Sequence, residues 1–519
     1  MPNLKINNKE IFVEENTTIL QAAEKIGIEI PSLCYKEGYE HFTSCMICVV
    51  LDKKTDKLIP SCSIDVEEGM EIETDNNRIA AARKDTMDML MCEHVGDCEA
   101  TCTRGCPANM NIPEMLRLIR QKKFDQAIEV VKKDIALPAV LGRICSAPCE
   151  GACIHKFKDE AVSICEMKKF VADLDLEKET PYQPAAEAPK DKKIAVVGAG
   201  PAGLAAAYYS ALAGYKTILF DKNENPGGGL QYGVPEEKLE KTVLDKEIEQ
   251  ILKPGVEFQG NKTLGKDFTV EELSQNYDAV ILSFGKIDKN INYGNLKVTD
   301  KGVTVDKKNF QTSIKNVFAI GSTIRDGRSA IRSCAHGKEV AQIINQFLET
   351  GSLAADKKRF NSVLGRLKPG ELEEFTKLSK EHKRLAKSEY SADEAVNEAA
   401  RCFHCDCRKI DNCRLRNYAD EFNADQRRFK INERNEFTRV VQHNNVIFEP
   451  GKCIKCNLCV QITEKAGEEF GLVMVNRGFD IKISTPFNES MKDCLKTTAD
   501  ECIESCPTAA LSRIEDYEV

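Results

Sequence analysis

The chain has 519 residues, of which 42% are hydrophobic and 30% charged, and its net charge of −9 is spread along the sequence. This balance is typical of a globular protein of several domains and argues against nucleic acid as a partner. No apolar run approaches the ~18 residues of a membrane span, and the N-terminus has no apolar signal core, so we expect a cytoplasmic protein that does not bind membranes.

Cysteine is unusually frequent, and its distribution indicates metal. Of the 23 cysteines, all but Cys334 lie outside residues 193–350, and they fall in tight groups. In a large chain without a signal peptide, clustered cysteines favour metal ligands over disulfides. Each group is therefore a candidate iron–sulfur or zinc site.

Residues 1–77 predict a small β-rich domain with one helix near residues 18–26. Its four cysteines are separated by ten, two and thirteen residues. Four thiolates brought together by a loop and a later strand suit a 2Fe–2S cluster, and zinc is the alternative. The candidate ligands are Cys34, Cys45, Cys48 and Cys62.

Residues 78–180 predict a helical domain with two 4Fe–4S clusters. Helices are expected over 78–92 and, as one continuous amphipathic helix, over 112–134. A run of cysteines ends in Cys106-Pro107, and a Cys-Pro ending is typical of proteins in which that cysteine ligates the second of two clusters. The candidate ligands are His94, Cys98, Cys102, Cys106, Cys145, Cys149, Cys153 and Cys165.

Residues 193–350 predict a Rossmann-type domain that follows a Pro-, Ala- and Lys-rich linker. A strand-like run precedes Gly198, Gly200 and Gly203, and an alanine-rich helix follows. The first glycine allows the turn, the second lets the backbone approach a pyrophosphate, and the third lets the helix pack on the strand. Asp221 ends the next strand, where a carboxylate can accept hydrogen bonds from ribose hydroxyls.

Two more cysteine groups follow. Residues 351–440 are expected to be a largely helical linker, whose cysteines bind a 4Fe–4S cluster or zinc. Residues 441–519 contain a CxxCxxC run and a later Cys506-Pro507, a pattern typical of a 4Fe–4S cluster, with Cys502 in reserve as fourth ligand. The candidate ligands are Cys402, Cys405, Cys407 and Cys413 in the first group and Cys453, Cys456, Cys459 and Cys506 in the second.

The second domain resembles the N-terminal domain of the glutamate synthase small subunit family. The resemblance lies in CPANMNIPEMLRLI, ALPAVLGRICSAPCEGAC and AVSICEMKKFVAD. It implies one 4Fe–4S cluster on Cys98, Cys102 and Cys153 and another on Cys106, Cys145 and Cys149.

Each of these clusters needs a fourth ligand. Cys165 lies where it can complete the second cluster. For the first, His94 and Cys92 are alternatives. We favour His94, because a histidine four positions before Cys98 resembles the histidine-ligated cluster of complex I and iron-only hydrogenases.

The Rossmann segment resembles the flavin domain of the same family. GGGLQYGVPEEKLEKTVLDKEI, DAVILSFG and NVFAIGS carry this resemblance, which implies FAD as the cofactor. The family inserts a second Rossmann domain for NAD(P)H before the last segment, but here only about thirty residues separate Gly285 from Val317, too few for that domain. Ser322 replaces the family's acidic residue. The implied contacts are Gly228, Gly229, Gly285, Gly321 and Ser322.

Both ends of the chain resemble ferredoxin-like parts of iron-only hydrogenases and of the large iron–sulfur subunit of complex I. At the C-terminus the similar segments are CIKCNLCV, GLVMVNRGFD and CPTAALS. The expected fold class is thus multidomain α/β and α+β. It comprises a β-grasp 2Fe–2S ferredoxin domain, an α-helical 4Fe–4S domain, an FAD-binding Rossmann domain and a C-terminal ferredoxin-like 4Fe–4S domain.

This mosaic implies an iron–sulfur flavoprotein subunit of a cytoplasmic hydrogenase- or formate dehydrogenase-type oxidoreductase. It would carry FAD, one 2Fe–2S cluster and three to four 4Fe–4S clusters, and it would have no NAD(P)H site of its own. The implied partners are a complex I-like NAD(H)/FMN subunit, a hydrogenase or formate dehydrogenase subunit and ferredoxin, and electron bifurcation is compatible with them. The alternatives are a free-standing NAD(P)H:acceptor or ferredoxin oxidoreductase, and a structural protein whose clusters only hold the fold.

Overall fold

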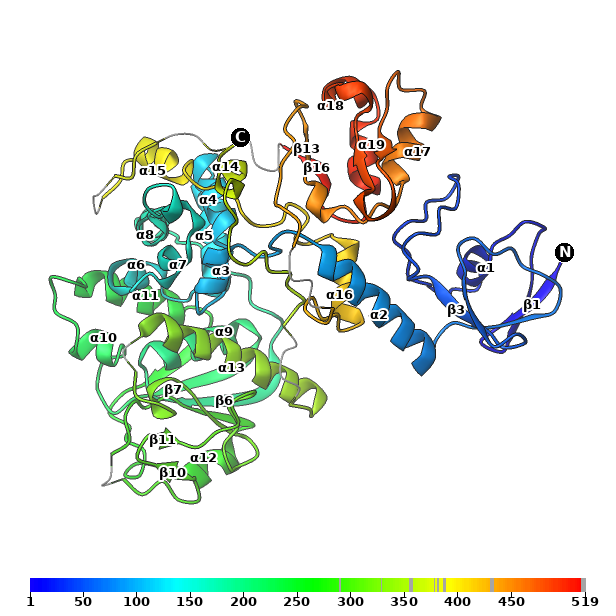
Figure 1. Cartoon of the computed structure of the whole chain (residues 1–519). Coiled ribbons are helices and arrows are strands. Elements are labelled where there is room, and N and C mark those ends of the chain that lie inside the picture. Colours follow the sequence, from blue (N-terminus) through cyan, green and yellow to red (C-terminus); the bar gives the residue numbers. More distant parts are fainter. Residues whose placement is uncertain are drawn as a thin grey trace. The chain divides into compact units, whose positions relative to one another are not determined.

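A computed structural model of the chain describes residues 1–288, 291–327, 329–353, 358–377, 379, 382–385, 389–429 and 434–514. The chain divides into two compact units (Figure 1). The first contains residues 1–100, 359–378 and 404–519, and the second contains residues 101–358 and 379–403. The segment 351–440, expected to be a single linker domain, contributes residues to both units.

The first unit begins with a five-stranded sheet packed against one helix. The strand order is β2-β1-β5-β3-β4, with β1 and β5 parallel and the other pairs antiparallel. Asn7 and Asn8 adopt φ angles of 48° and 67°, as a two-residue hairpin turn requires. Helix α1 begins with a capping box between Thr18 and Gln21. The elements are β1 (Asn3–Ile6), β2 (Lys9–Phe12), α1 (Ile19–Lys25), β3 (Val49–Asp52), β4 (Lys57–Pro60) and β5 (Met70–Glu73).

The rest of the first unit consists of the 17-residue helix α2, several short helices and two antiparallel strand pairs. Strand β13 pairs with β16, and β14 pairs with β15, around a core that includes Phe448, Ile483 and Leu511. The elements are α2 (Asn77–Glu93), α14 (Glu371–Thr376), α16 (Arg414–Glu421), β13 (Val446–Phe448), η3 (Pro450–Lys452), α17 (Leu458–Lys465), β14 (Val473–Val475), η4 (Gly478–Asp480), β15 (Lys482–Ser484), η5 (Pro486–Asn488), α18 (Met491–Cys494), α19 (Ala499–Ser505) and β16 (Leu511–Arg513).

The second unit begins with a bundle of short helices. Residues 112–134, expected to form one continuous helix, form two helices instead, because the first of them ends in a Schellman motif. Lys122 adopts a φ of 58°, its N–H donates to Ile119, and the N–H of Lys123 donates to Leu118. The elements are α3 (Thr101–Gly105), α4 (Ile112–Arg120), α5 (Phe124–Asp134), α6 (Pro138–Ile144), α7 (Pro148–Ala152), η1 (Ile154–Phe157), α8 (Ile164–Leu176) and α15 (Ala392–Ala399).

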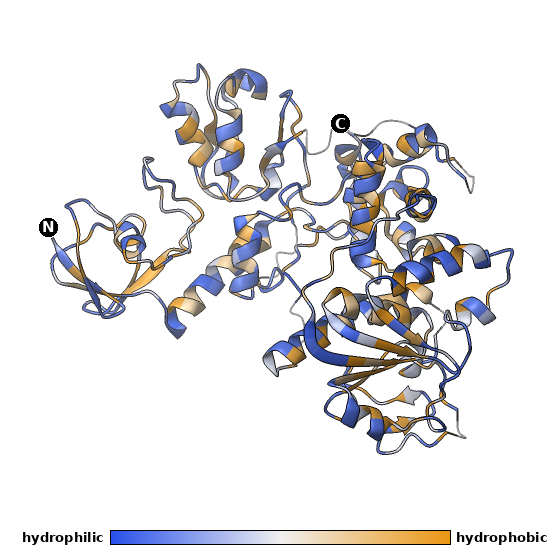
Figure 2. Ribbon diagram, turned by 180° about the vertical axis from the view of Figure 1, so that it is seen from behind, coloured by the Kyte–Doolittle hydropathy of each residue, from blue (hydrophilic) through white to orange (hydrophobic). Residues whose placement is uncertain are grey.

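The other part of the second unit is a doubly wound parallel sheet. Its strand order is β12-β9-β6-β7-β8, and the inner stretches of its strands are hydrophobic (Figure 2). Helices α9 and α13 cover one face, and Gly337 of α13 lies directly against the backbone of α9 (Figure 1). The elements are β6 (Lys190–Val197), α9 (Pro201–Leu212), β7 (Tyr215–Phe220), α10 (Gly229–Tyr232), α11 (Lys241–Leu252), β8 (Val256–Gln259), α12 (Val270–Asn276), β9 (Ala279–Leu282), β10 (Val298–Thr299), β11 (Gly302–Val303), β12 (Val317–Ala319), η2 (Gly321–Thr323) and α13 (Ala330–Thr350).

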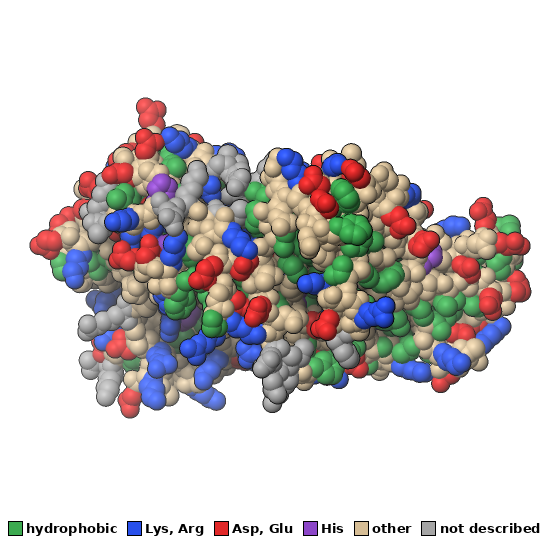
Figure 3. All heavy atoms as spheres, turned by 45° about the horizontal axis from the view of Figure 1, so that its top comes forward, with side chains coloured by type: hydrophobic (Ala, Val, Ile, Leu, Met, Phe, Trp, Pro, Cys, Tyr) green, Lys and Arg blue, Asp and Glu red, His purple; other side chains and the backbone are tan. Residues whose placement is uncertain are grey.

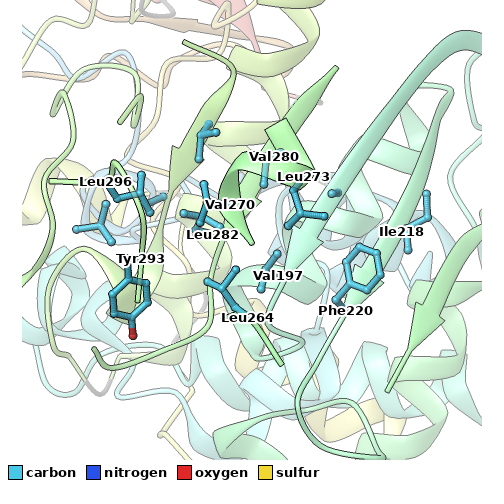
Figure 4. Close-up of a cluster of buried hydrophobic side chains, with 14 residues drawn as sticks. Val197, Ile218, Phe220, Leu264, Val270, Leu273, Val280, Leu282, Tyr293 and Leu296 are labelled. Carbon is cyan, nitrogen blue, oxygen red and sulfur yellow. The ribbon is translucent and has the colours of Figure 1, made fainter. Parts of the chain in front are cut away.

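The segment between β9 and β12 covers the other face of this sheet together with α12. Its described residues form only the two-residue antiparallel strands β10 and β11. Tyr293 and Leu296 from this segment pack into the same core as Val280 and Leu282 of β9 (Figure 4). Val303 belongs to this core as well. The segment is therefore part of the sheet's own hydrophobic core.

The surface carries charged side chains of both signs. Figure 3 shows lysine and arginine interspersed with aspartate and glutamate on the face that it presents. Among the residues that the structure describes, no helix is both long and apolar enough to cross a membrane.

Candidate functional site

The four N-terminal cysteines lie close together. Three of them are in the loop between α1 and β3, and Cys62 follows β4. The Sγ atoms of Cys34 and Cys45 lie 3.4 Å apart, and the thiols of Cys48 and Cys62 are within hydrogen-bonding reach of each other. All four are buried. Hydrogen bonds from Cys45 and then Cys62 lower the pKa of Cys34, and the hydrogen bond to Cys34 raises the pKa of Cys45 and of Cys62. Four buried thiols this close together fit a cluster held by four cysteines.

A second set of four cysteines lines one cavity in the helical part of the second unit. The cavity is walled by apolar side chains that include Ile112, Ile135 and Ile164. Its cysteines come from the end of α3, from the end of α6, from α7 and from α8. They are Cys106, Cys145, Cys149 and Cys165, the set expected from the sequence.

Lys168 lines the same cavity and was not anticipated from the sequence. It lies one helical turn after Cys165 on α8, is 4% exposed, and its Nζ lies 3.9 Å from the Sγ of Cys165. A buried ammonium is costly unless negative charge balances it. Burial and the neighbouring Cys106 raise the pKa of Cys149 to about 12, and Lys168 opposes this shift. The chemistry of the cavity therefore fits an anionic thiolate-bound cluster.

A third cavity, in the C-terminal part of the first unit, is lined by Cys453, Cys456, Cys459 and Cys506. Its walls are apolar and include Phe448 and Leu511. The reserve candidate Cys502 does not line this cavity, and its Sγ lies 3.8 Å from the carbonyl oxygen of Cys459. This geometry favours Cys506 as the fourth ligand.

The remaining predicted ligands are divided between the units. Cys98, Cys405, Cys407 and Cys413 belong to the first unit, whereas Cys102, Cys153 and Cys402 belong to the second. Among the described residues, no group of three or more His, Cys, Asp or Glu side chains is arranged to hold a single metal ion. A lone zinc ion holds its thiolates at about 2.3 Å, closer together than a cluster of several irons does.

His94 and Cys92 differ in their surroundings. The Nδ1 atom of His94 is buried and has no hydrogen-bond partner. Burial and the Lys452 ammonium lower the pKa of His94 to about 3, so the ring is neutral, as a metal ligand must be. The thiol of Cys92 donates instead to the carbonyl oxygen of Gln426 at 3.2 Å. These contacts favour His94 over Cys92 as a cluster ligand.

The glycine-rich turn lies between the carboxyl end of β6 and α9, where ligands of doubly wound sheets bind. Gly198 has a φ of 104°, and its N–H donates to Phe220 at 2.7 Å. A Cβ on Gly203 would lie 1.8 Å from the carbonyl oxygen of Gly198, whereas a Cβ on Gly200 would meet nothing within 4 Å. The backbone of Gly200 therefore faces open space at the helix N-terminus, which fits a pyrophosphate.

The other predicted FAD contacts surround this turn. A Cβ on Gly228 would lie 2.8 Å from Gly200, and one on Gly321 would lie 2.9 Å from Ala202. The N–H of Gly285 donates to the Thr323 hydroxyl at 3.1 Å. Gly229 faces open space, and the Ser322 hydroxyl donates to the carbonyl of Gly327 at 3.1 Å.

Asp221 has a structural partner that the motif did not indicate. One of its carboxylate oxygens accepts the N–H of Ala199 at 2.7 Å, and the other accepts from Asn223. A second side chain, the Ser283 hydroxyl, lies within hydrogen-bonding distance of the carbonyl oxygens of Val197 and Gly198 at the same turn. Because a carboxylate has about four acceptor positions, Asp221 can hold the turn and still accept from a ribose. The two roles are compatible.

Glu247 links the Rossmann-type domain to the helix that precedes Cys145. Its buried carboxylate accepts the N–H groups of Ala139 at 2.7 Å and Val140 at 2.8 Å, at the start of α6. Burial raises its pKa to about 7. The N-terminus of this helix is thus capped by a residue from another domain.

We expect Glu247 to make the stability of the second unit depend on pH. In the folded chain its pKa is about 7, above the ~4.3 of an unfolded chain. Its contribution to the free energy of unfolding is therefore complete below about pH 4.3 and is lost as the pH rises through about 7. The total loss is roughly 3 kcal/mol. The urea midpoints of the wild type and Glu247→Gln should be compared between about pH 5 and about pH 8. The wild type should lose more stability than the neutral variant; parallel profiles would contradict this role.

Three family models match consecutive parts of the chain. Residues 2–77 match the 2Fe–2S iron–sulfur cluster binding domain, and residues 74–180 match domain II of dihydropyrimidine dehydrogenase, which holds a 4Fe–4S cluster. Residues 186–338 match the pyridine nucleotide-disulphide oxidoreductases. The expected fold class and the presence of both kinds of iron–sulfur domain are thereby confirmed.

Relatives among characterised proteins are similar over about a third of the chain. The NADPH-Fe(3+) oxidoreductase subunit beta of Geobacter sulfurreducens is 38% identical over 190 residues, which is 36% of this chain and 28% of that protein. The NADP(+)-dependent formate dehydrogenase subunit beta of Moorella thermoacetica is 35% identical over 207 residues, 36% of this chain and 29% of that protein. The glutamate synthase [NADPH] small chain of Bacillus subtilis is 37% identical over 183 residues, 35% of this chain and 37% of that protein.

The chain thus spans about 28–37% of the length of these relatives. They confirm the resemblance to the glutamate synthase small subunit, and all three are oxidoreductase subunits or chains. The chain accordingly joins segments that match a 2Fe–2S domain, a 4Fe–4S domain and a pyridine nucleotide-disulphide oxidoreductase domain.

Proposed function

We propose that the chain is an iron–sulfur flavoprotein subunit that relays electrons between other subunits of a cytoplasmic oxidoreductase. FAD would supply two-electron chemistry, and the clusters would transfer electrons singly. The proposed partners are a complex I-like subunit that reacts with NAD(H), a hydrogenase or formate dehydrogenase subunit, and ferredoxin. The similarity to the beta subunit of a formate dehydrogenase supports a role within such an assembly.

The observation that carries this proposal is the segment between β9 and β12. A nicotinamide domain at this point would need its own parallel strands and crossover helices. The described residues of the segment instead form the β10–β11 pair, and their apolar side chains complete the core of the flavin-type sheet. The described residues of this segment offer no second dinucleotide site, so electrons would reach the flavin through the clusters.

We expect the isolated holoprotein to be reduced slowly by NADH or NADPH and quickly by dithionite or reduced ferredoxin. Stopped-flow bleaching of the flavin absorbance under anaerobic conditions measures both rates. Addition of a complex I-like NAD(H) subunit should restore fast reduction by the nucleotide, and this mixture is the positive control.

The alternative is a free-standing NAD(P)H:acceptor reductase, favoured by the similarity to an NADPH-Fe(3+) oxidoreductase subunit. It would be established if NADH or NADPH bleached the isolated chain at a rate on the order of an ordinary turnover, ~10 per second. That result would overturn the relay proposal.

A further inference from the structure

A backbone hydrogen bond joins two cysteine segments that are far apart in the sequence. Within the first unit, the N–H of Cys407 donates to the carbonyl oxygen of Cys98 at 3.0 Å. The bond connects the loop that follows α2, which contains Cys98, with the cysteine group that precedes α16, which contains Cys407. Cys98, Cys407 and Cys413 are all buried, with exposed fractions of 6%, 5% and 5%. Three thiols from two segments are thus shielded from solvent in one region.

A salt bridge also joins the segment of Cys413 to that of Cys98. Arg416, three residues after Cys413, donates to the carboxylate of Glu99 at 2.8 Å, and Glu99 directly follows Cys98. This contact and the backbone hydrogen bond from Cys407 hold the two cysteine segments side by side.

The surroundings of Cys98 fit a ligand of an anionic cluster. The N–H of Ser362 donates to the Sγ of Cys98 at 3.4 Å. Two buried cations, Lys452 and Arg416, lie near Cys98. Lys452 is fixed by its 2.6 Å contact with Glu449. A thiolate with N–H donors and cations around it is the form in which cysteine binds iron.

We propose that Cys98, Cys407 and Cys413 ligate one 4Fe–4S cluster in the first unit. The inference rests on the proposed role of the chain as a carrier of clusters. It differs from the sequence assignment, which places Cys98 with Cys102 and Cys153 and treats residues 402–413 as a separate site. One thiolate serves one cluster here, so the two assignments exclude each other.

This site would adjoin the C-terminal cluster. The Lys409 ammonium donates to the carbonyl oxygen of Cys506 at 2.9 Å, and the N–H of Leu415 donates to that of Pro507 at 3.2 Å. Cys413 shares one hydrophobic core with Cys456 and with Cys34 of the N-terminal group. The cluster would therefore lie on an electron path that joins both ferredoxin-like parts of the first unit.

The test compares which cysteines lose the same cluster. Cys98→Ala, Cys413→Ala, their double variant and Cys153→Ala are prepared anaerobically as full chains, and their iron, zinc and dithionite-reduced paramagnetic resonance spectra are measured. Cys98→Ala and Cys413→Ala should abolish or convert the same signal, each with a loss of up to about four irons. The double variant should lose no more than either single variant, and Cys153→Ala should affect a different signal.

Cys494→Ala is the matched control, because this buried thiol of the first unit lies outside every proposed ligand set. If Cys98→Ala does not fold, Cys98→Ser should keep the chain folded and shift the signal that Cys413→Ala removes. The proposal is overturned if Cys98→Ala and Cys153→Ala remove the same signal, or if Cys413→Ala releases zinc. Fast reduction of the isolated chain by NADH would overturn the relay function and leave this ligand set intact.

Discussion

Replacement of Cys165 by alanine is expected to remove one 4Fe–4S cluster and about four irons per chain. Cys165 lines a single cavity with Cys106, Cys145 and Cys149, and its thiol donates to the carbonyl oxygen of Leu141 at 3.4 Å. Without it the cluster would keep three protein ligands in a cavity with apolar walls. Iron analysis and paramagnetic resonance of the anaerobic protein should show the loss of one signal, while the other clusters remain.

Two further variants of the second unit test the same cluster assignment. Cys334→Ala removes another buried thiol of the same unit, whose Sγ lies 3.6 Å from the carbonyl oxygen of Pro201, and it should leave the iron content unchanged. Lys168→Met should keep the cluster but make its reduction potential more negative, because removal of a nearby positive charge disfavours addition of an electron. Unchanged iron in Cys165→Ala would contradict the four-cysteine assignment.

A Gly203→Ala variant is expected to bind FAD at least about tenfold more weakly and to unfold more readily. The new Cβ would lie 1.8 Å from the carbonyl oxygen of Gly198 and 2.6 Å from the Ser283 hydroxyl, so the turn must move. Overpacking of this kind costs about 1–3 kcal/mol, and a factor of ten in affinity corresponds to about 1.4 kcal/mol. Flavin content and thermal unfolding measure the two effects.

Gly200→Ala is the matched comparison for this prediction. Its Cβ would meet no protein atom within 4 Å, so the apoprotein should keep its stability. The same Cβ would occupy the space into which the backbone admits a pyrophosphate, so FAD should bind more weakly. Equal flavin content in Gly200→Ala and the wild type would mean that the dinucleotide does not approach this turn.

The sequence by itself determined the features that depend on local spacing. The cysteines within each loop and the glycines of the turn are close in the chain, so their separation alone restricts the chemistry they can perform. The short distance from Gly285 to Val317 likewise limits what can fold between them, because a strand and crossover helix need a minimum number of residues. These features indicated the cysteine groups and the dinucleotide turn, and the resemblance of longer segments to known families implied the fold class.

The sequence did not reveal the break between α4 and α5. No glycine marks it, because Lys122 itself takes the left-handed conformation that ends α4. The hydrophobic period also continues across the break, so periodicity could not show it.

Only the tertiary structure decided the contacts between distant segments. It placed Lys168 in the cavity of four cysteines, joined Asp221 to Ala199, and brought Cys407 to Cys98. Each of these contacts results from packing of whole elements, which depends on the sum of many weak interactions rather than on any motif. Spacing therefore predicted which residues can bind a cluster, and only the packed structure could indicate which of them bind the same one.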